Sequence, residues 1–153
     1  DEDEEYAKEC FDLAEALDLS NDVEFTGRIN IKDYLGRMDM TILTSISEGQ
    51  PLTILESYAA HKPVIATDVG NCNGLVYGGI ITHIMNVEEI AQAMVEMAQK
   101  KEMRLEMGEN GYRRVMAKYR VEYMQKTYWE IYRDFAHNMK VEWSEPPVMV
   151  PAE

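Results

Sequence analysis

Residues 40–70 read MTILTSISEGQPLTILESYAAHKPVIATDVG, and this stretch decides the fold. Residues 40–44 are β-branched and largely apolar, which predicts a strand buried on both faces. A polar turn follows, and Pro51 then begins a segment with helical spacing. The predicted apolar face of that helix consists of Leu52, Leu55 and Ala59. Residues 64–67 predict another short buried strand, so the order is strand, helix, strand.

The segments on either side predict further elements of the same kinds. Residues 4–18 carry one apolar helical stripe, and residues 23–26 alternate apolar and polar as a short strand does. Asn30 can cap a helix through Leu35. The remaining predictions are a strand at 80–84 and helices at 87–101, 103–118 and 121–138. Together they predict an α/β fold, a Rossmann-like parallel sheet with helices on both faces.

The size of the chain fits a single domain. It has 153 residues, of which 46% are hydrophobic and 28% charged, the balance of a compact globular domain. We expect residues 1–139 to form this domain. Residues 140–153 include Pro146, Pro147 and Pro151 and are predicted to be an extended or disordered C-terminal tail.

Composition excludes several classes of function. A formal net charge of -13 argues against binding to nucleic acid, which usually needs a basic face. No apolar run approaches the roughly 20 residues of a membrane span, and the acidic N-terminus does not resemble a signal peptide, so we expect a cytoplasmic protein. Cys10 and Cys72 are expected to be reduced. The three histidines lie far apart without metal-ligand spacing, and no metal site is expected.

Ligands of open parallel sheets bind outside the carboxyl ends of the strands. Glu48 and the turn Gly49-Gln50-Pro51-Leu52 follow the strand at 40–44, and a glycine loop follows the strand at 64–67. Glycine lets the backbone approach a ligand closely, and the N-terminus of a helix presents unpaired N–H groups. The pattern therefore predicts an anion site.

Two carboxylates flank this predicted anion site. Seven residues separate Glu48, at the mouth of the helix, from Glu56, about a turn and a half deeper. Carboxylates accept hydrogen bonds from vicinal hydroxyls, so the pair suits a molecule with hydroxyl groups on both sides of a phosphate, such as a nucleotide sugar. Taken alone, such a pair of glutamates is more often solvated helix surface.

The run SISEGQPLTILESYAAHKPVIATDVG resembles the donor-binding signature of the retaining family 4 glycosyltransferases, in which E-x7-E precedes a PVIAT strand and a glycine loop. Upstream, VEFTGRIN and YLGRMDMTILTS fit the same order. The sequence TSISEGQPL resembles the exopolysaccharide, PelF-like branch of this family most closely. The resemblance covers about residues 20 to 135 and implies the C-terminal half of a GT-B fold.

The resemblance also implies roles for particular residues. Glu56 would bind the ribose hydroxyls, Glu48 would face the transferred sugar as the catalytic candidate, and the backbone of Gly49, Gln50, Pro51 and Leu52 would contact the sugar and the diphosphate. Arg28 and Ile29 would lie near the base, although a surface role for Arg28 is an equal alternative. The implied donor is a nucleotide-diphosphate sugar, UDP-glucose, used with no metal or other cofactor.

The sequence departs from the family pattern at two places. Family members usually begin this domain with a strand and a glycine loop carrying a basic pair, and usually have a longer loop where residues 71–81 stand. In that shorter connection, Asn73 and Gly74 suit a turn. We expect a fragment truncated at its N-terminal strand, inactive by itself. An N-terminal domain would bind the glycan or other acceptor, within a membrane-associated polysaccharide synthesis complex.

Two other functions remain open from the sequence. One is a nucleotide-sugar epimerase of the same architecture, although the E-x7-E spacing favours transfer. The other is a non-catalytic subunit that binds sugar nucleotides or serves assembly.

Overall fold

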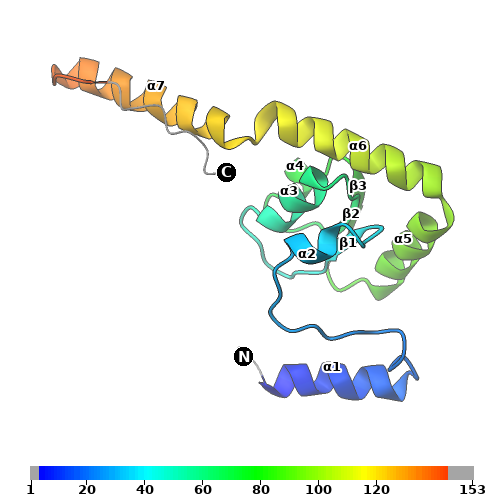
Figure 1. The fold of residues 1–153 in the computed structure, drawn as a ribbon. Helices are drawn as coiled ribbons and strands as arrows, with labels where there is room; N and C mark the ends of the chain where they lie inside the picture. The colour runs from blue at the N-terminus through cyan, green and yellow to red at the C-terminus, as the bar shows by residue number, and fades with distance from the viewer. Residues whose placement is uncertain (1–3, 145–153) are drawn as a thin grey trace. The chain divides into compact units, whose positions relative to one another are not determined.

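The computed structural model describes residues 4–144, which form parts of two compact units, residues 1–34 and 35–153 (Figure 1). Of the tail predicted at 140–153, residues 145–153 lie outside the described residues. Within the described residues, no helix is both long and apolar enough to cross a lipid bilayer.

The first unit contains one long helix, α1 (Glu4–Ala16), close to the predicted span. In its apolar stripe Ala14 is buried and Cys10 is half-buried, and the other members are exposed. The predicted strand at 23–26 is wrong, because these residues are irregular and exposed. A strand needs a hydrogen-bonded neighbour. The described part of this unit contains no other strand to supply one.

The short helix α2 (Lys32–Leu35) ends where the second unit begins. Asn30 Oδ1 accepts a hydrogen bond from the Lys32 N–H at 3.3 Å, which is the capping role that the sequence predicts.

The second unit is built on a parallel sheet, which confirms the predicted fold class. Its strands are β1 (Thr41–Leu43), β2 (Val64–Thr67) and β3 (Gly79–Thr82), in the order β1-β2-β3. All four residues of β2 are buried, as predicted. The prediction that the first strand is buried on both faces is wrong, because β1 is an edge strand and Ile42 is 38% exposed.

Helices cover both faces of the sheet, as Figure 1 shows for α3 and α5. On one face, Val64 and Ala66 of β2 pack with α3 (Leu52–Ala59), α4 (Cys72–Leu75) and α6 (Lys101–Lys118). On the other face, Ile65 packs with Ala93 and Met97 of α5 (Val87–Gln99). The alternation of β2 side chains therefore assigns each helix its face. The last helix is α7 (Val121–Met139), and α5, α6 and α7 all match their predicted spans closely.

One buried tyrosine holds the connection between β2 and β3. The Tyr58 hydroxyl, on α3, accepts hydrogen bonds from the Tyr77 and Gly78 N–H groups, both at 3.1 Å. Burial raises the pKa of Tyr58. Gly111 of α6 lies against the Tyr58 ring so closely that a Cβ there would overlap it. The connection itself contains α4, so the prediction of a turn at Asn73 and Gly74 is wrong: both residues are helical.

Candidate functional site

Two loops at the carboxyl end of the sheet pack against each other. We call residues 44–51 the Glu48 loop and residues 68–71 the Gly70 loop; they follow β1 and β2. Gly70 has a φ of +52°, and a Cβ on it would overlap the Glu48 carbonyl oxygen and lie 2.9 Å from the Gly49 oxygen. The Asn71 N–H donates to that Gly49 oxygen at 3.0 Å. The two loops therefore have a fixed backbone contact that requires glycine at position 70.

The start of the Glu48 loop is attached to the central strand. Thr67 is the last residue of β2 and is buried. Its Oγ1 donates to the Ser45 carbonyl oxygen at 2.5 Å and lies 3.4 Å from the Leu43 oxygen. Thr67 thus attaches the start of the Glu48 loop to the end of β2.

The Glu48 side chain is half-buried and hydrogen-bonded. The Ser45 hydroxyl donates to Glu48 Oε1 at 2.7 Å. Burial, with the negative charges of Glu48 and Asp68 nearby, raises the pKa of the Cys72 thiol at the start of α4. A thiol with a raised pKa stays protonated at neutral pH. Cys72 and Cys10 are both free, as the sequence predicts.

The helix after the Glu48 loop begins without a side-chain cap. Pro51 is buried, with φ -68° and ψ 118°, and accepts no capping hydrogen bond because it has no polar side chain. The first N–H groups of α3 therefore have no side-chain acceptor at this end. They form the positive end of the helix dipole, next to the Glu48 loop.

Glu56 lies on the exposed side of α3. The residues that α3 buries are Ile54, Ser57 and Tyr58, whereas Leu52 is 66% exposed. The apolar face predicted from Leu52 is therefore wrong. In a helix of eight residues the apolar spacing fits two faces, and the sheet and α6 cover the one with Ser57. The Ser57 hydroxyl accepts from Thr41 Oγ1 at 2.8 Å. Glu56 follows Leu52 by four residues and so shares its exposed face.

The two carboxylates are held differently. Among the described residues, no hydrogen bond or ion pair fixes the Glu56 carboxylate, whereas Ser45 fixes that of Glu48. An exposed carboxylate near an uncapped helix start is open to hydroxyl groups of a ligand. Gly49 and Gln50, between Glu48 and Pro51, are also exposed.

Arg28 and Ile29 belong to the other unit, where Arg28 is exposed and Ile29 half-buried. Their role near a nucleotide base stays a prediction.

Sequence reasoning assigned no role to Ser45 or Thr67. Both are polar residues at or just beyond strand ends, which is the signal that could have found them. It also missed the third loop at this edge, after β3. There the Glu89 carboxylate accepts from the His83 N–H at 2.8 Å, and Asn86 caps α5 by accepting from the Glu89 N–H at 3.2 Å.

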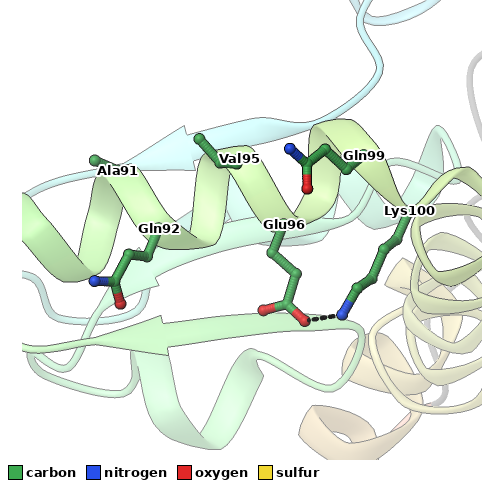
Figure 2. Close-up of a pocket in the computed structure, with 6 residues that line it drawn as sticks. All are labelled: Ala91, Gln92, Val95, Glu96, Gln99 and Lys100. Carbon is green, nitrogen blue, oxygen red and sulfur yellow. Dashed lines mark hydrogen bonds and ion pairs between the residues drawn. The ribbon is translucent and has the colours of Figure 1, made fainter.

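A shallow hollow lies elsewhere, along the outer side of α5 (Figure 2). It is lined by Ala91, Gln92, Val95, Glu96, Gln99 and Lys100. The inner side of α5 packs on β2 and β3, so the hollow lies on the opposite face of the sheet from α3. Its charged groups, Glu96 and Lys100, pair with each other at 2.6 Å. The hollow is therefore separate from the Glu48 loop. Over the described residues, no group of three His, Cys, Asp or Glu side chains could hold a metal ion.

The chain is similar to several glycosyltransferases. The uncharacterized glycosyltransferase MJ1178 of Methanocaldococcus jannaschii is 30% identical over 95 residues, 58% of this chain and 27% of that protein. The C-terminal domain of the group 1 glycosyl transferase LpcC from Francisella tularensis superposes with a TM-score of 0.73 at 25% identity, covering 78% of this chain and 65% of that one.

A second solved structure is Anabaena Alr3699/HepE in complex with UDP-glucose. It has a TM-score of 0.81 at 22% identity and covers 87% of this chain and 38% of that one. Its likeness, at this identity, supports the fold. The curated relatives are much longer than the aligned region: the chain spans between 20% and 35% of their lengths.

The match to a family covers most of the chain. Residues 3–114 match the family described as glycosyl transferases group 1, and they include the Glu48 loop, Glu56 and the Gly70 loop. The chain therefore belongs to the glycosyl transferases group 1 family, with the GT-B type of Rossmann-like domain.

Proposed function

We propose that this chain is the donor-binding domain of a retaining family 4 glycosyltransferase that transfers a hexose from a nucleotide-diphosphate sugar to a glycan or other acceptor. A further domain would bind the acceptor. The observation that carries the proposal is the contact between the Glu48 loop and the Gly70 loop, which fixes the backbone of Glu48 beside the uncapped start of α3. Ser45 holds the half-buried carboxylate of Glu48 there.

Each part of this edge suits a part of the donor. The exposed Glu56 carboxylate accepts hydrogen bonds from the ribose hydroxyls. The first N–H groups of α3, with the backbone of Gly49 and Gln50, bind the diphosphate, which is favoured at the positive end of a helix. Glu48 faces the transferred sugar.

The same groups act as the sugar leaves. Negative charge builds on the departing diphosphate, and the fixed dipoles at the start of α3 stabilise it. Positive charge builds on the sugar in its oxocarbenium-like state, and the Glu48 carboxylate stabilises that charge. Fixed groups need no reorganisation during the reaction, so the anchored loop favours the transition state over the bound donor.

We infer that the donor is UDP-glucose and that the product is an exopolysaccharide. The structure of Anabaena Alr3699/HepE in complex with UDP-glucose supports this choice of donor. The sequence TSISEGQPL, which resembles the PelF-like branch, supports an exopolysaccharide as the product.

Calorimetric titration of the chain with UDP, UDP-glucose, GDP-mannose and ADP-glucose tests donor binding. We expect Glu56→Ala to weaken binding of the preferred donor by about 2 kcal/mol, roughly thirtyfold, because hydrogen bonds to a charged group are lost. Glu106→Ala is the matched control: it removes an exposed glutamate on a different helix, α6, and should bind the donor as the wild type does. An unchanged dissociation constant for Glu56→Ala removes Glu56 from the site.

The rate of sugar transfer by the full-length enzyme tests Glu48. Glu48→Ala should lower kcat more than it weakens donor binding, because its contact strengthens as charge develops on the sugar. Equal losses in rate and in affinity contradict the catalytic role. Donor binding without any transfer by the full-length protein favours the non-catalytic sugar-nucleotide-binding subunit instead.

A further inference from the structure

Ser45 links the Glu48 carboxylate to the core of the domain. Its hydroxyl donates to Glu48 Oε1 at 2.7 Å, and its own carbonyl oxygen accepts from Thr67 Oγ1 at 2.5 Å. Thr67 is buried at the end of the central strand β2. Ser45 therefore joins the half-buried carboxylate of Glu48 to the buried end of the central strand by two short hydrogen bonds.

The backbone of Glu48 is fixed separately from its side chain. Gly70 lies directly against the Glu48 carbonyl group, and the Asn71 N–H donates to the Gly49 oxygen. These contacts leave the rotatable bonds of the Glu48 side chain free. The bond from Ser45 restricts them, and hydrogen bonds to a carboxylate are stronger than those between neutral groups.

The two carboxylate oxygens of Glu48 have different surroundings. Oε1 accepts from Ser45, whereas within residues 4–144 no group of the protein bonds to Oε2. A carboxylate with one oxygen held by a short bond presents the other oxygen in a defined direction.

We propose that Ser45 is a positioning residue for sugar transfer: its hydroxyl holds Oε1 of Glu48 so that Oε2 faces the donor sugar. This inference rests on the proposed function, in which Glu48 faces that sugar. Ser45 acts through Glu48 and does not touch the nucleotide.

Single substitutions can separate the hydroxyl from the rest of the loop. Ser45→Ala removes the bond to Glu48 but keeps the carbonyl oxygen that accepts from Thr67, so the loop backbone stays attached to β2. Ser45→Thr keeps the hydroxyl. Ser47→Ala is the matched control, because Ser47 is exposed in the same turn and, in the described part of the chain, makes no hydrogen bond through its hydroxyl.

A double-mutant cycle in the full-length enzyme tests the proposal. We expect Ser45→Ala to lower kcat on the order of tenfold to a hundredfold, the range for one hydrogen bond to a charged group, with the dissociation constant of UDP unchanged. Ser45→Thr should recover most of the rate, and Ser47→Ala should keep it. In a Glu48→Ala background, Ser45→Ala should cause no further loss, because its partner is already absent.

Three results overturn the positioning role: a wild-type rate for Ser45→Ala, no recovery by Ser45→Thr, or an equal further loss in the Glu48→Ala background. The last result is what a purely structural role of Ser45 produces.

If the wild-type enzyme transfers no sugar, the proposed function fails, and ligand affinities then test the role of Ser45. Ser45→Ala should weaken the binding of UDP-glucose but not the binding of UDP. The proposal is overturned if variant and wild type have equal affinities for both ligands, or if the wild type binds neither.

Discussion

Ile42 and Ile65 are the same residue at paired positions of neighbouring parallel strands, yet their surroundings differ. Ile65, on β2, is 1% exposed and packs with Ala93 and Met97, whereas Ile42, on β1, is 38% exposed. Both strands are rich in β-branched residues. The difference shows that burial follows from the position of a strand in the sheet: the centre around β2 is packed on both faces, and the periphery is not.

The largest effect expected from this difference comes from truncating the two isoleucines. Ile65→Ala should lower the free energy of unfolding by about 4 kcal/mol, because it leaves a cavity between β2 and α5. Ile42→Ala should cost less than about 1 kcal/mol, since solvent already reaches the side chain. Denaturant titration of both variants measures the two losses. Equal losses would mean that β1 is covered in solution.

Glycines with positive φ provide the next comparison. Gly70, at the centre, has a φ of +52° and no room for a Cβ, whereas Gly27, in the first unit, has a φ of +61° and nothing within 4 Å of a Cβ. Gly27→Ala should cost only the strained backbone, about 1 kcal/mol. Gly70→Ala adds an overlap with the Glu48 carbonyl group and should cost about 3 kcal/mol.

Thermal unfolding and donor binding of the two glycine variants provide the check. Gly70→Ala should also weaken donor binding, because it displaces the Glu48 loop. Gly27→Ala should leave the Glu48 loop in place. Comparable melting temperatures for the two variants would contradict the close contact between the loops.

Much of the fold and part of the site could be predicted from the sequence. The helices α5, α6 and α7 follow from long apolar periodicities, and β2 follows from a short apolar run with turns on both sides. Glu48 follows from the rule that ligand-binding groups stand after the carboxyl ends of parallel strands.

The failures have a common physical cause. Alternation at 23–26 says which side chains could share a face, but it does not say whether a neighbouring strand supplies hydrogen bonds. Likewise, the spacing of Leu52 in the eight-residue helix α3 is compatible with two faces, and the packing of α3 against the sheet and α6 decides between them. The hydrogen bond between Thr67 and Ser45 joins residues 22 positions apart, so no local pattern reveals that bond.

Tyrosine hydroxyls give a smaller contrast between centre and periphery. The Tyr58 hydroxyl is buried and accepts two backbone N–H groups, whereas Tyr128 is exposed on α7. Tyr58→Phe should lower the free energy of unfolding by about 2 kcal/mol, because it leaves the Gly78 N–H buried without an acceptor. Tyr128→Phe should change it by no more than about 0.5 kcal/mol. Urea titration measures both free energies of unfolding. If Tyr58→Phe left this free energy unchanged, water would have to reach the Gly78 N–H.

The smallest expected effect belongs to an exposed carboxylate at the start of α5. The His83 N–H and then the His83 ring hold the pKa of Glu89 below its usual value. A carboxylate with a lowered pKa in the folded state stabilises the protein above its unfolded-state pKa, and this contribution is lost as the pH falls through the folded-state pKa. The difference in unfolding free energy between wild type and Glu89→Gln should therefore be present at about pH 5 and shrink as the pH falls below about 4. Glu88→Gln, which removes the adjacent exposed carboxylate, is the control for the loss of one charge. A difference that grows on acidification would reverse the sign of the argument and show that the His83 contacts do not favour the ionised form of Glu89.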